Sequence, residues 1–165
     1  LRPDVVDATL FWAGDQDIVR VVARAKALQA FVESGDGNNL LTGYKRAANI
    51  LKAEEKKDGR RHAFDAAIPR SAYIGETEKN LATFFVPAPG ATSTPFFDEA
   101  DALLGREDFA GAMAHLARLR PVVDRFFDDV TVNDPDPATR ARRLGLLAAI
   151  REAMHRIADF SRLEG

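Results

Sequence analysis

Apolar residues along the chain recur mostly at spacings of three and four, which is the pattern of amphipathic helices. Strict alternation of apolar and polar residues survives only at 130–132, which is too short to make a sheet. The pattern therefore predicts an all-α helical bundle, whose longest helices run over about 17–33, 40–57 and 136–161. The other predicted helices cover about 3–13, 76–85, 95–104, 108–119 and 122–127.

The apolar positions also predict which side chains face the core. The final helix carries the clearest core stripe, formed by Leu144, Leu147, Ile150, Met154, Ile157 and Phe160. In the helix over 17–33 the residues expected to point inward are Val21, Val22, Leu28 and Phe31. The first helix is expected to contribute apolar surface from Val5, Val6, Leu10, Phe11 and Trp12.

Capping residues set several of the predicted boundaries. Thr94-Pro95 and Asp136-Pro137 each combine a capping side chain with proline in the first turn of a helix, and Asp108 can cap another helix. Pro121 predicts a break or kink after Arg120. Residues 34–39 are rich in residue types that favour turns, so the sequence predicts a break between two helices there.

The chain has the length of a single domain, and we expect residues 1–165 to form one. Residues 58–69 show no clear period and residues 87–95 read as a loop between helices, so we expect an irregular segment over about 58–95. Because the chain begins at Leu1 rather than at methionine, we expect it to be part of a longer protein.

Composition excludes several classes of protein. The balance of 46% hydrophobic and 29% charged residues is that of an ordinary globular domain. There are no cysteines, which excludes disulfides, thiolate zinc sites and cysteine nucleophiles and fits a cytoplasmic location. No apolar run approaches the roughly 18 residues of a membrane span, and no signal peptide is visible. A net charge of −2 argues against a DNA-wrapping protein.

The sequence offers little catalytic chemistry. His62, His115 and His155 have no metal-ligand spacing, and we interpret all three as ordinary surface residues. The acidic residues at 98, 99 and 101 are explained by the charge preference of a helix start. Phosphate-binding loops, nucleophile elbows and dinucleotide fingerprints are missing from the sequence. We therefore expect no catalytic residue, no metal ligand and no cofactor in this domain, and a stand-alone metabolic enzyme is disfavoured.

Basic residues form two clusters. Residues 45–61 hold seven basic side chains against three acidic ones, and residues 140–156 hold five arginines against Glu152. An acidic chain that concentrates its cations in this way can bind phosphates and stay soluble. The alternative is a solvated helix face, and Glu152 with Arg156 forms an i,i+4 pair consistent with it.

The most distinctive stretch is Tyr44-Lys45-Arg46-Ala47-Ala48-Asn49-Ile50-Leu51. Asparagine is unfavourable in the middle of a helix, so Asn49 asks for a hydrogen-bonding reason. The stretch resembles the lysine-arginine-x-x-asparagine-isoleucine helix of the DALR-type anticodon-binding domains, which close arginyl-tRNA synthetases and the β subunits of bacterial glycyl-tRNA synthetases. Residues 23–31, 39–41, 123–130, 143–147 and 157–161 are similar to the glycyl β subunits.

The chain departs from that family in three places. Thr131 stands where the family usually has methionine, residues 58–95 match poorly, and the last four residues are more polar than usual. The resemblance implies a helical anticodon-binding bundle whose parent ligase attaches glycine to tRNA(Gly), using ATP and magnesium. It implies an α₂β₂ assembly in which the α subunit activates glycine. The domain itself would be non-catalytic and would contact tRNA, with no DNA or membrane partner.

The resemblance and the basic clusters together give a set of candidate tRNA contacts. We assign the basic members to phosphates, and Asn49 either to a base edge or to an intramolecular hydrogen bond. The candidates are Lys45, Arg46, Asn49, Arg140, Arg142 and Arg143.

Two alternatives stay open beside this interpretation. One is the anticodon-binding domain of an arginyl-tRNA synthetase. The other is a helical protein-interaction module that docks a partner through Phe126 and Phe127, although burial in the core explains these two residues more simply.

Overall fold

A computed structural model describes residues 1–10 and 12–164, and this part of the chain contains helices and no strand. The predicted all-α bundle is confirmed. The α-helices are α1 (Pro3–Thr9), α2 (Ile18–Glu33), α3 (Gly35–Asp58), α4 (Gly75–Thr83), α5 (Pro95–Gly105), α6 (Phe109–Leu116), α7 (Arg120–Asp129) and α8 (Pro137–His155). Four short 3-10 turns accompany them, at Trp12–Gly14, Arg70–Ala72, Ala117–Leu119 and Phe160–Arg162. Among the described residues no helix combines the length and the apolar character needed to span a bilayer.

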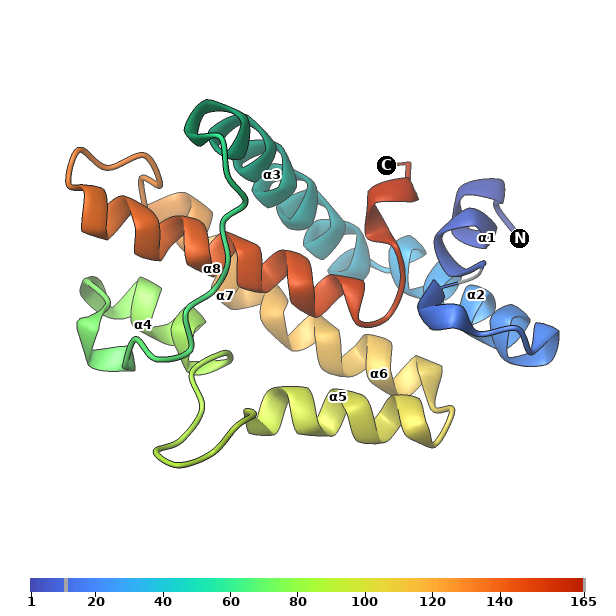
Figure 1. Cartoon of the computed structure of the whole chain (residues 1–165). Helices are drawn as coiled ribbons and strands as arrows, with labels where there is room; N and C mark the ends of the chain where they lie inside the picture. Colours follow the sequence, from blue (N-terminus) through green and yellow to red (C-terminus); the bar gives the residue numbers. More distant parts are fainter. Residues whose placement is uncertain (11, 165) are drawn as a thin grey trace.

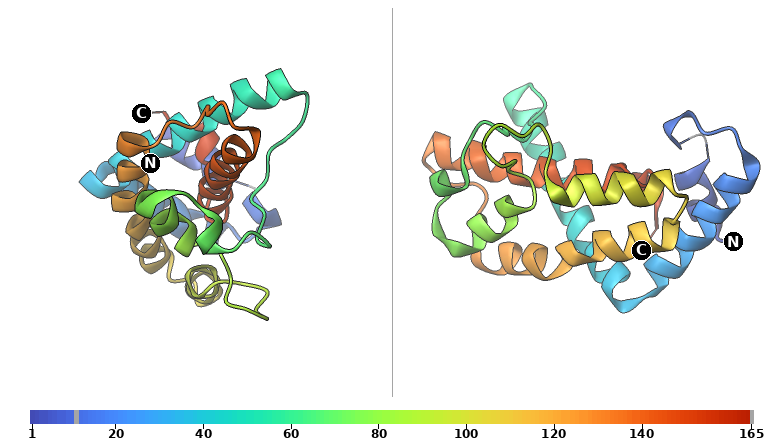
Figure 2. Two further views of the ribbon diagram at one scale, coloured as in Figure 1. Left: turned by 90° about the vertical axis from the view of Figure 1, so that its left-hand side faces the viewer. Right: turned by 90° about the horizontal axis from the view of Figure 1, so that it is seen from below.

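Helix α8 lies in the middle of the bundle (Figure 1). Helix α3 packs across α8 and also contacts α7, while α4 covers α7 and α5 covers α6. Helices α1 and α2 close the opposite end, where α2 packs against α3 and α6 (Figure 2). The segment that follows α3 runs back across α8 and leads to α4 (Figure 1). This arrangement leaves one long side of α3 open to solvent.

The predicted core of the last helix is confirmed. All six residues of its apolar stripe are buried, and so are the intervening residues Leu146, Ala148 and Ala149, because neighbouring helices surround α8. Phe126 is fully buried and Phe127 packs against the core. The core interpretation is therefore confirmed for Phe126, whereas Phe127 is partly buried against the core.

The predicted caps are confirmed as well. The side chains of Thr94, Asp108 and Asp136 accept hydrogen bonds from backbone N–H groups in the first turns of α5, α6 and α8. Pro121 stands in the first turn of α7, where its missing N–H costs nothing. The helical path is interrupted by the 3-10 turn Ala117–Leu119, before Arg120 and not after it as predicted.

Several predicted boundaries were wrong. The predicted break between two helices at 34–39 is confined to Ser34, whose extended backbone separates α2 from α3; Ser34 caps α3 by accepting a hydrogen bond from the Gly37 N–H, and the helix begins at Gly35. Helix α8 ends at His155 rather than near 161, because the Asp159 N–H donates to the Ala8 carbonyl and draws the chain toward α1. Within the segment 58–95, α4 (Gly75–Thr83) confirms the helix predicted at about 76–85, and the rest contains only the last residue of α3, the 3-10 turn Arg70–Ala72 and the first residue of α5.

The first helix is also shorter than predicted. Helix α1 ends at Thr9, and Leu10 and Val22, both predicted to contribute to the core, are exposed. Phe11 was expected to add apolar surface but lies outside the described residues. Trp12 approaches the ring of His155 edge-on, with 5.7 Å between ring centroids.

Gly37 makes the early start of α3 possible. A Cβ atom at this position would overlap the backbone carbonyl of Phe31, whereas a Cβ at Gly35 meets nothing within 4 Å. We therefore expect Gly37→Ala to lower the free energy of unfolding by about 1–3 kcal/mol, the usual range for overpacking. Urea denaturation measures this change. Gly35→Ala is the matched control and should be neutral or slightly stabilising; an equal loss in both variants would contradict the packing argument.

Candidate nucleic-acid interface

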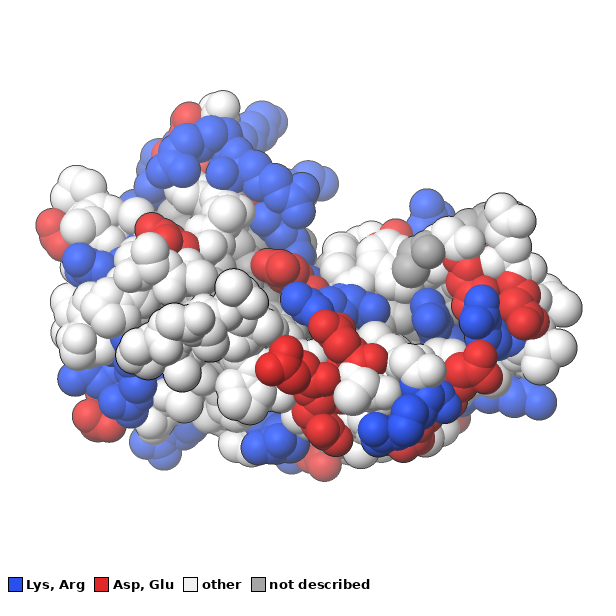
Figure 3. All heavy atoms as spheres, turned by 60° about the horizontal axis from the view of Figure 1, so that its bottom comes forward, with Lys and Arg blue, Asp and Glu red and all other residues white. Residues whose placement is uncertain are grey.

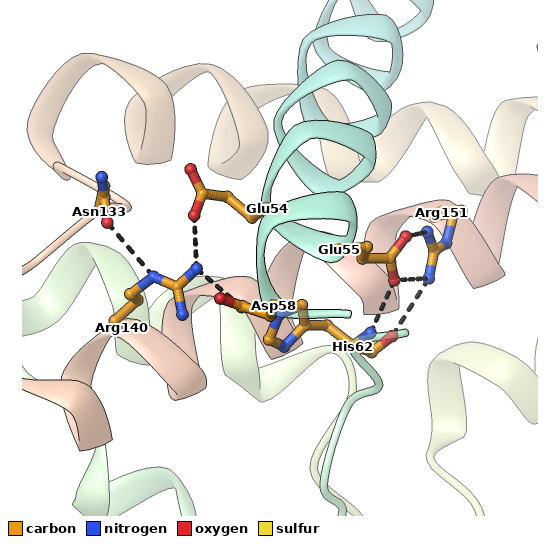
Figure 4. A network of polar contacts seen from close by, with 7 residues as sticks. All are labelled: Glu54, Glu55, Asp58, His62, Asn133, Arg140 and Arg151. Atoms are coloured by element: carbon orange, nitrogen blue, oxygen red, sulfur yellow. Dashed lines mark hydrogen bonds and ion pairs between the residues drawn. The ribbon is translucent and has the colours of Figure 1, made fainter. Parts of the chain in front are cut away.

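The acidic residues near the end of α3 are tied to arginines of α8 (Figure 4). The guanidinium group of Arg140 donates to the carboxylates of Glu54 and Asp58. On the other side of α3, Arg151 donates through Nη1 to Oε1 of Glu55 at 2.9 Å and through Nη2 to Oε2 at 3.3 Å. Two arginines of α8 therefore hold the end of α3 from both sides.

His62 belongs to the same network. Its backbone N–H donates to Glu55 at 2.7 Å, its carbonyl accepts from Arg151 at 3.1 Å, and its imidazole lies 2.7 Å from Asp58 (Figure 4). Its side chain is only 4% exposed, so the interpretation of His62 as a surface residue was wrong. The network fixes the point at which the chain leaves α3 and turns across α8.

The other two histidines are also structural. His115 is buried, its Nε2 lies 2.7 Å from the carbonyl oxygen of Phe96, and its ring stacks on that phenylalanine. His155 is half-buried, and its Nε2 lies 2.6 Å from the hydroxyl of Tyr44. Their interpretation as ordinary surface residues was therefore wrong, because each binds a partner that is distant in sequence.

The ion pairs keep the acidic groups of the network charged. The hydrogen bond from Arg140 holds the pKa of Asp58 below its usual value, and the imidazole of His62 adds to this effect. Burial alone would raise the pKa of Glu55, but hydrogen bonds from Arg151 and the His62 N–H lower it below its usual value. The carboxylates of Glu55 and Asp58 therefore remain ionised at neutral pH and pair with arginines of α8.

The basic residues of α3 are left without such partners. Within the part of the chain that the structure describes, no carboxylate forms an ion pair with the lysines of α3, which are Lys45, Lys52, Lys56 and Lys57. Figure 3 shows basic side chains gathered where α3 ends. The exposed residues there include Arg60 and Arg61 as well as the lysines of the last turns.

One side of α3 carries a continuous polar stripe. Lys45, Asn49, Lys52 and Lys56 are spaced by four, three and four residues, which places them on one side of the helix, away from the buried positions. We call these four residues the α3 stripe. Beside it, the guanidinium group of Arg46 lies 4.7 Å from the centre of the Phe127 ring, which holds it at the surface. The structure thus brings Lys45, Arg46 and Asn49 together, as the sequence suggested.

Asn49 is exposed, and its side chain forms no hydrogen bond with any residue that the structure describes. The structure therefore provides no described partner for the intramolecular hydrogen bond that was the alternative role of this asparagine. Its amide faces solvent between Lys45 and Lys52, so it is available to a bound molecule.

The second basic cluster is used mainly inside the domain. Arg143 donates to Glu78 at 2.8 Å, to the Thr131 carbonyl and to Asp134 at 3.3 Å. Arg140 and Arg151 bind the acidic residues of α3, as described above. Arg142 differs from these arginines, because it forms no ion pair with a described residue and lines a cleft beside Arg60.

Arg156 also has an internal role. It pairs with Asp101 at 2.9 Å and lies over the ring of Phe97, so the expected pair between Glu152 and Arg156 was wrong. Asp101, which we had explained by the charge preference of a helix start, is instead an ion-pair partner. The α3 cluster therefore faces solvent, while most of the α8 cluster neutralises acidic groups of the domain.

The burial of His155 makes the stability of the domain depend on pH. Burial lowers the pKa of His155 below its usual value, opposed by the carboxylate of Asp159 and reinforced by Arg151. The unfolded chain takes up a proton near pH 6.5 that the folded chain resists, so stability falls as the pH drops below that value. The carboxyl group of Asp159 has a lowered pKa and stays ionised in this window.

We therefore expect the melting temperature to fall between pH 7.5 and pH 5.5, with a smaller decrease in the variant His155→Gln. Glutamine can still bond the Tyr44 hydroxyl but does not titrate. Calorimetry at a series of pH values measures both profiles. Identical decreases in the two proteins would assign the pH dependence to other groups.

Comparison with known proteins finds similarity over the whole chain. The glycine–tRNA ligase beta subunit of Phenylobacterium zucineum is 48% identical over 164 residues, which are 99% of this chain and 23% of that protein. The proteins of the same name from Rhodospirillum centenum and a Ruegeria species are 44% and 41% identical over 165 residues. The chain spans less than a quarter of the length of these relatives. No model of a known protein family matches it.

Proposed function

We propose that this chain is the tRNA-binding domain of a glycine–tRNA ligase β subunit, of the anticodon-binding DALR type, and that it binds tRNA(Gly) through α3. One observation carries the proposal: Arg140 and Arg151 of α8 pair with Glu54, Glu55 and Asp58, whereas the lysines of α3 form no ion pair with a described residue. Basic side chains without internal partners can bind phosphates without first breaking an ion pair within the domain. The similarity of the whole of this chain to part of the glycine–tRNA ligase β subunits supports the choice of RNA, and of tRNA(Gly), as the ligand.

The candidate residues take different roles in this proposal. Lys45 and Arg46 contact phosphates, and Lys52 and Lys56 extend the same track along the α3 stripe. Asn49 presents its amide to a base edge, because it is exposed between two lysines. Arg142 contacts the RNA at the end of this track.

Arg140 and Arg143 act differently, although the sequence made them candidates for phosphate contact. Their guanidinium groups already bind the carboxylates of Glu54, Asp58 and Glu78. We propose that these two arginines hold α3 and α4 in place and that they contribute to RNA binding by keeping the acidic groups neutralised.

The domain serves a larger enzyme in this proposal. The parent is an α₂β₂ ligase of the cytoplasm that uses ATP and magnesium, and its α subunit activates glycine. The domain alone should not catalyse glycine-dependent exchange between ATP and pyrophosphate. The relatives, which are more than four times as long as the matched segment, support the view that other parts of the assembly carry the chemistry.

A salt titration of tRNA binding tests the function. Fluorescence anisotropy with a labelled tRNA(Gly) transcript should give an affinity whose logarithm falls linearly with the logarithm of salt concentration, by about 0.7–0.9 for each phosphate contacted. Three or four contacts along α3 predict a slope of about −2 to −4. A tRNA(Arg) transcript is the competitor that tests the arginyl alternative. An affinity that does not change with salt concentration, or an affinity for duplex DNA equal to that for the tRNA(Gly) transcript, would overturn the proposal.

A further inference from the structure

A cleft lies where the segment after α3 crosses the first half of α8. It has a volume of about 290 Å³ and lies between residues 60–73 and residues 138–145. This volume is near the lower end of the range for small-molecule pockets, about 300 Å³. It suits a group the size of one nucleotide and excludes a helical stem.

The wall that α8 contributes is made of small residues. Ala138, Ala141 and Gly145 line the cleft and repeat at spacings of three and four, so they lie on one side of the helix. A Cβ at Gly145 would lie 3.3 Å from the Ala63 carbonyl, which shows how closely the crossing segment approaches α8. With Ile68 they give the cleft a flat, largely apolar wall.

Tyr73 lines the cleft and brings an unused hydrogen-bonding group to it. Its side chain is 3% exposed, yet its hydroxyl forms no hydrogen bond with a residue of the described chain. Burial raises the pKa of this hydroxyl to about 12, so it is a protonated donor at neutral pH. The hydroxyl itself is not closed off from solvent, so it is free to donate a hydrogen bond to a molecule in the cleft.

The charges around the cleft favour an anion. Arg60 and Arg142 line it, and neither forms an ion pair with a described carboxylate. The lining also includes Asp65, whose side chain accepts a hydrogen bond from the Ala67 N–H, and His62, whose ring contacts Asp58. Two guanidinium groups without a described ion-pair partner therefore stand beside the small residues of α8 and the hydroxyl of Tyr73.

We propose that this cleft takes a single unstacked nucleotide of the RNA bound along α3. Arg60 and Arg142 contact its phosphate, the base lies against the wall of small residues, and Tyr73 hydrogen-bonds the base or the ribose. Unpaired nucleotides in RNA loops are commonly recognised in this way, splayed from the stack and bonded at their edges. This inference rests on the proposed RNA binding by α3 and adds the site at which one nucleotide is selected.

Two substitutions probe the cleft without emptying the core. Tyr73→Phe removes only the hydroxyl and should weaken binding of the tRNA(Gly) transcript about threefold to tenfold, the value of one hydrogen bond. Arg142→Gln should weaken binding about tenfold, as expected for a charge-assisted contact. Tyr44→Phe and Arg106→Gln are the matched controls, because both residues lie outside the cleft, and they should bind as the parent does.

A coupling experiment identifies the nucleotide. A series of transcripts is made, each lacking the base at one unpaired position. The affinity of each transcript is measured for the parent protein and for Tyr73→Phe. At one position, removal of the base should weaken binding to the parent clearly and to Tyr73→Phe much less, because the lost partners are the same. Cooperative melting transitions well above the assay temperature show that the variants fold.

The possible outcomes separate the two proposals. If no position couples to Tyr73, while charge reversal on α3 still weakens binding, the cleft assignment is wrong and the α3 face stands. If charge reversal on α3 has no effect either, the proposed function itself fails. A free mononucleotide (AMP, GMP, CMP or UMP) that binds at micromolar concentration without competing with the transcript would assign the cleft to a small molecule and overturn its role in RNA binding.

Discussion

The double variant Lys45→Glu with Arg46→Glu is expected to bind the tRNA(Gly) transcript about a hundredfold more weakly than the parent at 0.1 M salt. Each lost phosphate contact removes the counterion release that drives binding, and each new carboxylate repels the backbone. The slope of the salt dependence should become shallower by about 1.5. Fluorescence anisotropy at several salt concentrations measures both quantities. Helicity should be unchanged, because both side chains lie at the surface of α3.

The matched control is Lys26→Glu with Arg106→Glu, which alters net charge by the same amount. Both residues are exposed, on α2 and just after α5, away from the α3 stripe. Its affinity for the tRNA(Gly) transcript should fall by less than about threefold, because only the net charge of the domain has changed. Equal losses in the two double variants would show that binding depends on net charge alone and that α3 is not the contact surface.

Arg143→Met is expected to lower the melting temperature by about 10 °C. Glu78 is only 2% exposed, and the guanidinium group of Arg143 is its ion-pair partner at 2.8 Å. Removing one partner of a buried pair leaves an uncompensated charge and costs about 3–5 kcal/mol, whereas methionine keeps much of the arginine volume. For a domain of this size that cost corresponds to a shift of this order. Calorimetry gives the melting temperature directly.

A second substitution should rescue this loss. In Glu78→Leu with Arg143→Met both charges are gone and the buried site is apolar, so stability should return to within about 1–2 kcal/mol of the parent. The control is Arg125→Met, which breaks an exposed pair with Asp129 and should cost less than about 1 kcal/mol. A double variant as unstable as Arg143→Met would show that the loss comes from packing or from the contacts to Thr131 and Asp134.

The local parts of the fold were readable in the sequence. The caps at Thr94, Asp108 and Asp136 depend on side chains within three residues of the N–H groups they bond, so sequence spacing reveals them. The start of α3 was missed for a tertiary reason. Turn-forming residues at 35–39 favour a loop locally, but the Ser34 cap and the close approach of Gly37 to Phe31 hold this stretch in a helix.

The basic residues of the candidate site could be located from the sequence, but their ion-pair partners could not. The count of basic residues located both clusters, yet the partners of Arg140 and Arg151 lie 82 to 96 residues away in sequence. Helical periodicity gives no information about such distant pairs, so the two clusters looked alike. The same limit explains the histidines: the partners of His115 and His155 are 19 and 111 residues away.

The ion pairs between α8 and α3 also have a consequence for the order of events during synthesis and folding. During synthesis α3 emerges well before α8, because Arg140 and Arg151 follow their α3 partners by 82 to 96 residues. Until α8 docks, the carboxylates of Glu54, Glu55 and Asp58 stand among the lysines of α3 and weaken their attraction for phosphate. A nascent chain would therefore lack part of the RNA-binding surface that we propose. On this proposal, the surface is complete only when α8 has been made and packed, so RNA binding would follow folding.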